Sequence, residues 1–263
     1  MRSLFSSMKN PPDTLQRVWN ESFPIRSYDV DSEGLATLPA LCRFMQEAAL
    51  NHASHLGIGM SHLRPQGLVW VLARQRITVH EFPRLDESVT IRTEPTGKDR
   101  IFCYRDFAML DGAGRVIGEA HTVWFVMGRR DKKPRRPDSY FTVRFDDGRE
   151  GIPPSKLRKL PEPKISEFPA GIRVSYRDLD MNEHVNNVRY IEWIIDSFPL
   201  EFLRNHTLKE LEINYLAEAL YADEISLGHE NRGPLTFLHS MTRPIDNTHI
   251  CRARTTWTMR HVP

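Results

Sequence analysis

The chain has 263 residues, of which 40% are hydrophobic and 27% are charged, and its formal net charge is +2. This length and hydrophobic content suffice for one large domain or for two smaller ones. The small net charge argues against a nucleic-acid-binding protein, and no apolar run is long enough to span a bilayer. We therefore expect a soluble protein with no nucleic-acid partner and no membrane span.

The first residues do not have the features of a targeting segment. Their apolar stretch is too short for a secretory signal and they contain a single arginine, so residues 1–16 are expected to be a disordered start. The three cysteines, Cys42, Cys103 and Cys251, lie far apart and form no CxxC pair. Their spacing favours a reducing, cytoplasmic location without disulfides or structural zinc. No motif indicates a metal ion or an organic cofactor.

A strand at residues 21–28 and a long helix are predicted to open the first half. Thr37 is a suitable N-cap, Pro39 is tolerated in the first turn, and Gly57 ends the helix. Apolar residues recur at helical spacing and cover most of the helix surface, so the sheet that follows is expected to wrap around it.

Four strands are predicted next, and together with the helix they give a first domain at residues 17–128. The first strand is a continuous apolar run, which is typical of a strand buried on both faces. The sequence Asp-Gly-Ala-Gly joins the last two strands and opens no helix, so it is interpreted as a hairpin turn and not as a phosphate-binding loop. The strands are expected at residues 68–73, 88–94, 101–109 and 116–127.

Residues 129–168 are rich in proline and in charge, and they are predicted to form a semi-rigid linker. Such a basic segment can steer an acidic partner by electrostatics, although charge runs in linkers are usually only solvated. Six basic residues crowd near its start: Arg129, Arg130, Lys132, Lys133, Arg135 and Arg136.

The second half, residues 169–263, repeats the plan of the first. A strand at 171–176 precedes a helix at 185–197, and strands follow at 208–217, 224–229, 235–242 and 249–259. Three segments of the first half recur in the same order, which indicates an internal duplication. Ala120, Thr122 and Trp124 align with Ala253, Thr255 and Trp257, residues 27–31 align with 176–180, and the segment from Glu81 aligns with the segment from Glu218.

A helix followed by antiparallel strands, twice, predicts an α+β fold. In each half the sheet would curl around its helix, and the two sheets would join side by side.

A candidate site lies just before the second helix. Asp180, Asn182 and His184 alternate along the chain, so an extended backbone places all three side chains on one face. The free N–H groups at the start of the helix would stabilise an oxyanion nearby. The alternative is an ordinary helix cap followed by a surface loop. The matching segment of the first half has Glu33 and Leu35 in the last two positions, which favours a functional role for the second copy.

The segment LDMNEHVNNVRYIEWIIDSFP, residues 179–199, resembles the plant and bacterial acyl-acyl-carrier-protein thioesterases. FMQEAALNHASHLG, LVWVLARQRITVHEFPRLDESVTI and GEAHTVWFVM resemble further segments of that family, so the similarity runs from residue 19 to residue 259. It implies a tandem pair of hotdog domains. It also implies hydrolysis of fatty acyl-acyl carrier protein to free fatty acid and holo-carrier protein, with the carrier protein as partner.

The resemblance also implies a catalytic set. The family's Asp-x-Asn-x-His motif falls on Asp180, Asn182 and His184, and its later glutamate falls on Glu218. Ala219 stands where the plant pattern has a cysteine, so a cysteine nucleophile is impossible there. We expect either direct attack by water or an inactive enzyme. Partial burial among apolar neighbours would make Glu218 a stronger base, and the sequence leaves open whether Glu218 or His184 takes the proton.

Several alternatives stay open at this point. The chain could be an acyl-CoA thioesterase on the same fold, or a non-catalytic acyl-binding protein, and it could pair into a homodimer. His52 and His55 have a spacing that could hold a metal ion, but a structural role is favoured because no acidic or cysteine partner is evident. An acyl tunnel could be lined by Leu41, Phe44, Met45 and Ala48, although ordinary core packing is the commoner role for such residues.

Overall fold

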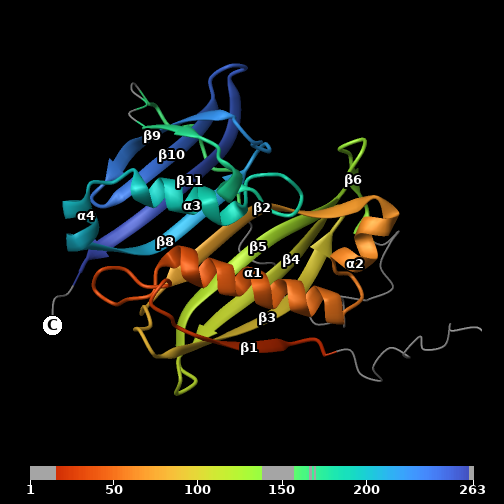
Figure 1. Ribbon diagram of the computed structural model, residues 1–263, viewed down its shortest axis with the longest axis horizontal. Helices are drawn as coiled ribbons and strands as arrows, with labels where there is room; N and C mark the ends of the chain where they lie inside the picture. Colours follow the sequence, from red (N-terminus) through yellow and green to blue (C-terminus); the bar gives the residue numbers. More distant parts are fainter. Residues whose placement is uncertain (1–15, 138–156, 166–167, 169, 261–263) are drawn as a thin grey trace, which may run out of the picture.

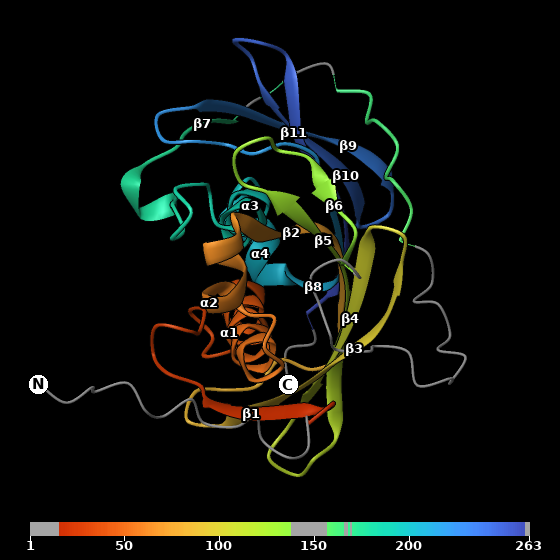
Figure 2. The same cartoon turned by 90° about the vertical axis from the view of Figure 1, so that its right-hand side faces the viewer.

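The computed structural model describes residues 16–137, 157–165, 168 and 170–260. Its strands form one 11-stranded antiparallel sheet with the main order β1-β3-β4-β5-β2-β8-β11-β10-β9-β7. Figures 1 and 2 show the sheet curving around the helices, with α1 and α3 on the same side. The predicted α+β tandem hotdog is confirmed, with one helix wrapped by each half of the sheet.

The first half contains a long helix and five strands, with two short helical turns between them. Its elements are β1 (Trp19–Pro24), α1 (Leu38–His55), α2 (Met60–Leu63), a 3-10 turn (Arg64–Gln66), β2 (Leu68–Val79), β3 (Ser88–Asp99), β4 (Phe102–Leu110) and β5 (Val116–Gly128).

Helix α1 begins and ends where its capping residues predict. The side-chain oxygen of Thr37 accepts a hydrogen bond from the Ala40 N–H (3.2 Å), and Pro39 lies in the first turn. Gly57 follows the helix with φ +70°, a conformation that glycine adopts without the Cβ penalty. The described residues contain no helix that is long and apolar enough to cross a membrane.

The second half repeats this arrangement. Its elements are β7 (Ala170–Arg173), a 3-10 turn (Tyr176–Asp178), α3 (Asn187–Asp196), α4 (Leu200–Asn205), β8 (His206–Tyr215), β9 (Glu224–Gly233), β10 (Thr236–Arg243) and β11 (Thr248–Met259). The sequence did not predict α4, because six residues are too few to show a helical period.

The predicted linker begins with a short strand, β6 (Pro134–Arg135), which pairs with β5. Residues 138–156 of that linker, and residues 1–15 of the predicted disordered start, lie outside the described residues. The predicted domain boundaries therefore stay a prediction.

The two halves join through β2 and β8, which pair in the centre of the sheet (Figure 1). Arg74 lies opposite Asn214 and Thr78 opposite Glu210. This pairing explains why β2 runs to Val79 and not to residue 73 as predicted. Residues 74–78 of β2 form the seam with the other half, and Ile77 and Val79 belong to the hydrophobic core that includes Leu41 and Met45 of α1.

The predicted duplication has a structural counterpart in one repeated hydrogen bond. The indole N–H of Trp124 donates to the Thr122 hydroxyl (2.8 Å), and the indole N–H of Trp257 donates in the same way to the Thr255 hydroxyl (3.1 Å). Residues aligned by sequence therefore occupy equivalent positions in β5 and β11.

The third repeat was aligned one residue out of register. The side chains of Glu87 and Asp223 each accept a hydrogen bond from the backbone N–H three residues earlier, at 2.8 and 3.0 Å. This match pairs Phe82 with Glu218, so the prediction that Glu81 is the counterpart of Glu218 is wrong. The alignment went wrong because it matched Glu81 to Glu218 by residue type, although Glu81 lies one position before the true counterpart.

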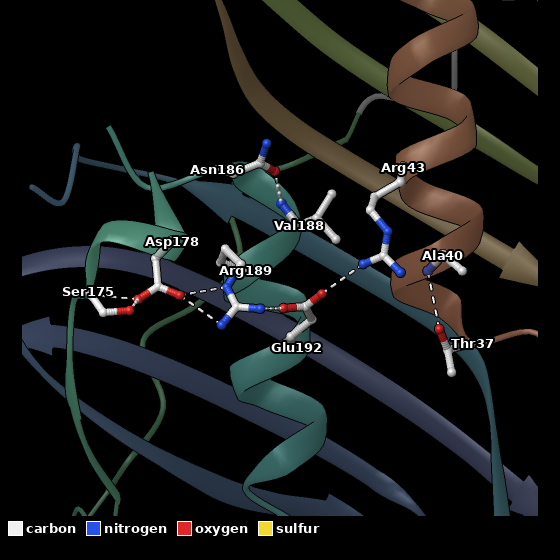
Figure 3. Close-up of polar contacts among 9 residues, drawn as sticks. All are labelled: Thr37, Ala40, Arg43, Ser175, Asp178, Asn186, Val188, Arg189 and Glu192. Atoms are coloured by element: carbon white, nitrogen blue, oxygen red, sulfur yellow. Dashed lines mark hydrogen bonds and ion pairs between the residues drawn. The ribbon is translucent and has the colours of Figure 1, made fainter. Parts of the chain in front are cut away.

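Charged side chains link the start of the second half to α1 (Figure 3). Ser175 donates to Asp178 (2.6 Å), and the Arg189 guanidinium bridges Asp178 (2.7 Å) and Glu192. Glu192 in turn accepts from Arg43 on α1 (2.9 Å). The chain of contacts fixes α3, and with it the loop that precedes α3, relative to the first half.

Two buried histidines are neutral at physiological pH. Burial lowers the pKa of His239 to about 3, and burial together with the positive charge of Arg105 lowers the pKa of His52 to about 4. The two ring nitrogens of His52 contact the Gln16 carbonyl oxygen (2.8 Å) and Arg105 (3.1 Å). Both ring nitrogens thus have protein partners, as expected for a structural histidine.

The low pKa values of these histidines predict that the protein becomes less stable as the pH is lowered. Unfolded histidine has a pKa near 6.5, so it is protonated below that pH. Folded His239 stays neutral down to about pH 3, so between these values protons stabilise the unfolded state. The free energy of unfolding should fall by up to about 1.4 kcal/mol per pH unit for each such histidine. Denaturant titrations between pH 7 and pH 5 measure this slope. His239→Gln should reduce the slope, whereas His62→Gln, at an exposed position, should leave it unchanged; equal slopes in all three proteins would contradict the assignment.

Candidate active site

Asp180 organises the loop that carries the predicted site residues. Its Oδ1 accepts hydrogen bonds from the backbone N–H groups of Asn182 (2.7 Å) and His184 (3.4 Å), and its own N–H donates to the His184 carbonyl (2.8 Å). In the first half, Asp31 makes the same two side-chain contacts with the backbone two and four residues later, at 2.9 and 3.1 Å. The aspartate therefore shapes the loop in both halves, and the two loops differ chemically at the positions of Asn182 and His184.

His184 and Glu218 are brought together by this loop. The Nε2 of His184 lies 3.4 Å from Oε2 of Glu218. The backbone N–H of Val185 donates to the Ala219 carbonyl (3.0 Å), which ties the loop to the segment that carries the glutamate. His184 and Glu218 are 34 positions apart in the sequence, and the backbone hydrogen bond between their neighbours Val185 and Ala219 holds their two segments together.

Lys132 is a third member of this cluster. Its ammonium group lies 3.1 Å from Oε1 and 2.8 Å from Oε2 of Glu218, so it contacts both carboxylate oxygens. Lys132 has φ +52° and lies in the turn between β5 and β6, where its N–H donates to the Gly128 carbonyl (3.0 Å). Lys132 and Glu218 are 86 residues apart, and their contact depends on the left-handed turn at Lys132, so the sequence did not predict it.

The sequence led us to expect that Glu218 is partly buried among apolar neighbours, and the structure contradicts this expectation. The Glu218 side chain is 36% exposed, and the flanking Leu216 and Leu220 are also exposed. The ionisable neighbours of this carboxylate are Lys132, at 2.8 Å, and His184, at 3.4 Å.

Asn182 lies two residues before His184 in the same loop. Its amide group makes no hydrogen bond with any of the residues described here. Helix α3 begins at Asn187, two residues later than predicted, because Asn186 caps it by accepting from the Val188 N–H at 2.9 Å (Figure 3). Because its amide group has no partner among the described residues, Asn182 is available to donate a hydrogen bond to a bound carbonyl oxygen.

An apolar cavity of about 300 Å³ adjoins the loop. Asp180 and Asn182 line it on one side, and α1 together with strands of the first half lines the rest. The α1 residues at its wall are Gln46, Ala49, Leu50 and Ala53. The residues considered for an acyl tunnel, Leu41, Phe44, Met45 and Ala48, belong to or pack against the hydrophobic core instead.

The cysteines are poor nucleophiles in this fold. Burial raises the pKa of Cys42, Cys103 and Cys251 to about 12 in each case, so the thiols stay protonated near neutral pH. Cys103 lines the cavity, but its thiol is inert for this reason. Ala219 has no nucleophilic side chain, so activated water is the nucleophile that the cluster can supply.

In the described part of the chain, no group of three or more His, Cys, Asp or Glu side chains is placed to hold a metal ion.

The fold defines a tandem hotdog protein in which His184 and Glu218 lie 3.4 Å apart, and the loop that carries His184 also contributes Asp180 and Asn182 to the wall of an apolar cavity. The family model for the acyl-ACP thioesterase N-terminal domain matches residues 16–141, and that for the C-terminal domain matches residues 162–259. The chain belongs to the acyl-ACP thioesterase family.

Two plant relatives illustrate this relationship. The chain is 32% identical to an oleoyl-acyl carrier protein thioesterase of Arabidopsis thaliana, over 78% of this chain and 60% of that protein. It is 30% identical to an acyl-[acyl-carrier-protein] hydrolase of Cuphea viscosissima, over 91% of this chain and 61% of that protein. The chain thus spans about three fifths of the length of either relative. Both are named as chloroplastic, so they do not confirm the predicted cytoplasmic location.

Solved structures show the same architecture. An acyl-ACP thioesterase from Bacteroides thetaiotaomicron superposes with a TM-score of 0.79 at 27% identity, covering 92% of this chain and 98% of the other. The 12:0-ACP thioesterase from Umbellularia californica superposes with a TM-score of 0.80 at 22% identity, covering 93% and 98%. The second likeness bears on the fold alone.

Proposed function

We propose that this protein hydrolyses the thioester of fatty acyl-acyl carrier protein and releases a free fatty acid and the holo-carrier protein. The observation that carries this proposal is the 3.4 Å contact of Glu218 with His184, in the loop whose Asn182 lines an apolar cavity. Family membership supports the reaction class.

The reaction divides into two proton transfers. Glu218 takes a proton from water while the water oxygen attacks the thioester carbon, and the side-chain amide of Asn182 donates to the oxyanion that forms. The carbon–sulfur bond then breaks, and the proton held by Glu218 passes to His184, 3.4 Å away, and from there to the leaving thiolate, which regenerates both groups. Asp180 holds the loop that positions both side chains, and Lys132 holds the Glu218 carboxylate.

We also propose that the basic segment beside the site docks the carrier protein. Arg129, Arg130, Lys133 and Arg136 are exposed and flank Lys132, which reaches Glu218. A negatively charged carrier protein attracted to this segment would deliver its thioester next to the cluster. The free, buried cysteines fit the reducing, cytoplasmic compartment that we propose for the protein.

A thiol-release assay with palmitoyl-carrier protein and palmitoyl-CoA tests this function. We expect turnover of the carrier-bound substrate to exceed that of the CoA-bound one. The double variant Arg129→Glu, Arg130→Glu should slow hydrolysis of the carrier-bound substrate and spare the CoA thioester. Equal losses on both would contradict docking, a preference for CoA would favour the acyl-CoA thioesterase, and no thiol release from either would favour an acyl-binding protein.

A further inference from the structure

The acyl cavity contains a buried cation that the proposed chemistry does not use. Arg105 on β4 lines the cavity and is only 8% exposed. Its Nη1 contacts Nδ1 of His52 (3.1 Å) and donates to the Thr93 hydroxyl (3.2 Å). His52 is neutral, so both acceptors lack negative charge. Within residues 16–137, 157–165 and 170–260, no carboxylate forms an ion pair with Arg105.

The remaining donors of this guanidinium are free. Its Nε and Nη2 make no hydrogen bond to any residue in the described ranges. Burial lowers the pKa of Arg105 to about 10, which still leaves the group charged near neutral pH. Since Arg105 lines the cavity, this free, planar pair of donors is available to a ligand oxygen that enters the cavity.

The fold itself does not require a cation at this position. Arg105 lies opposite Thr122 in the first half, and Phe237 lies opposite Thr255 in the second. Phe237 packs against Phe198 and other aromatic rings. The equivalent strand position thus accepts an apolar side chain, and attachment of β4 to α1 through His52 uses only Nη1 of Arg105.

The cavity wall around Arg105 is suited to a hydrocarbon chain. Ala49, Leu50, Trp70 and Trp124 are among the residues that line it. One fixed cation in such a wall acts as a specificity element, because a buried donor rejects a chain that offers it no acceptor.

We propose that Arg105 binds an oxygen atom carried on the acyl chain, so that the cavity takes hydroxy-, oxo- or carboxy-substituted acyl groups in preference to unsubstituted ones. This inference rests on the proposed function only in assuming that the cavity holds the acyl chain.

The test compares twelve-carbon acyl-carrier proteins that are unsubstituted or carry one hydroxyl group near the thioester, at mid-chain or at the last carbon. For the wild type, the ratio of kcat/KM between the best hydroxylated chain and the unsubstituted chain should be at least about 10, the size of one hydrogen bond to a charged donor. Arg105→Met, of similar shape, should bring this ratio to about 1, and thermal melting of the same preparation shows that the variant is folded.

Two further proteins make the result specific. Arg105→Lys keeps the charge but lacks the two-donor edge, so it should give an intermediate ratio. Gln46→Leu removes another polar side chain from the cavity wall and should keep the wild-type ratio. The proposal is overturned if Arg105→Met keeps the wild-type ratio, or if it changes only the preferred chain length.

Binding of the free acids separates this inference from the reaction. Trp70 and Trp124 line the cavity, so their fluorescence reports occupancy by dodecanoic acid and its hydroxylated forms. The wild type should bind the best hydroxylated acid at least about 10-fold more tightly than Arg105→Met does. If no thioester is hydrolysed but this difference is found, the proposed reaction fails and the cavity assignment stands. Equal binding by both proteins would overturn the cavity assignment whatever the activity.

Discussion

Replacing Glu218 with glutamine is expected to lower kcat by roughly 10² to 10⁴, the usual contribution of a general base. The substitution keeps the size and shape of the side chain but removes the group that takes the proton from water. Lys132 contacts both oxygens of Glu218, and His184 lies 3.4 Å away, so the amide can occupy the same place. Pre-steady-state thiol release with palmitoyl-carrier protein measures the chemical step directly.

Two matched variants show whether that loss belongs to the cluster. Glu119→Gln changes an exposed glutamate on β5 that forms no hydrogen bond or ion pair with His184, Glu218 or Lys132, and should keep wild-type turnover. Lys132→Met leaves the base intact but removes the cation that holds it, so kcat should fall by about 10-fold while KM for a CoA thioester changes little. Lys132→Arg should recover most of the loss. Turnover close to wild type in Glu218→Gln would remove this residue from the mechanism.

Replacing Asp180 with alanine is expected to lower kcat/KM by about 100-fold or more, although Asp180 need not touch the substrate. Its Oδ1 holds the backbone N–H groups of Asn182 and His184 at 2.7 and 3.4 Å. Loss of these contacts frees the loop, and a displacement of reacting groups by about 1 Å costs roughly 100-fold in rate. Steady-state kinetics and thermal melting of the same preparation separate displacement of the site from unfolding.

The first half supplies an internal control for this variant. Asp31 holds the equivalent loop, with contacts of 2.9 and 3.1 Å, but that loop carries no histidine or asparagine. Asp31→Ala should therefore cost about 1–3 kcal/mol in stability, the range for lost hydrogen bonds to a charged group, and should keep most of the activity. Equal loss of activity in the two variants would mean that the loops act through global stability and not through the catalytic groups.

Local rules predicted the parts of the fold that local rules govern. Thr37, Pro39 and Gly57 bound α1 as expected, since capping and breaking of a helix depend on a few neighbouring residues. The extended backbone predicted for Asp180, Asn182 and His184 is wrong: residues 181–184 form a turn with Glu183 at φ +65°, because Oδ1 of Asp180 accepts from the N–H groups of Asn182 and His184. The duplication was also visible, because the paired Trp–Thr contacts of β5 and β11 require the same residue types in both halves.

Features that depend on the arrangement of distant segments were not predictable in this way. The Lys132–Glu218 ion pair needs the β5–β6 turn to reach across to the second half, whereas composition suggested a solvated linker or a docking segment there and no contact with Glu218. The partner of Glu218 in the repeat was misplaced by one residue, because alignment by residue type cannot see the backbone pairing that fixes register. The free donors of Arg105 are likewise a property of packing, since nothing in its neighbouring sequence shows that no carboxylate reaches it.

The covalent union of the two hotdog halves has an evolutionary consequence. In a protein assembled from two identical subunits, every mutation appears twice, so a change that improves one pocket alters its symmetric partner as well. Here the loop with Leu35 and the loop with His184 are encoded separately, and so are Phe82 and Glu218 at the facing positions. One half can therefore acquire apolar or bulky side chains at these positions while the other keeps its acid–base pair. Selection can act on the two halves independently.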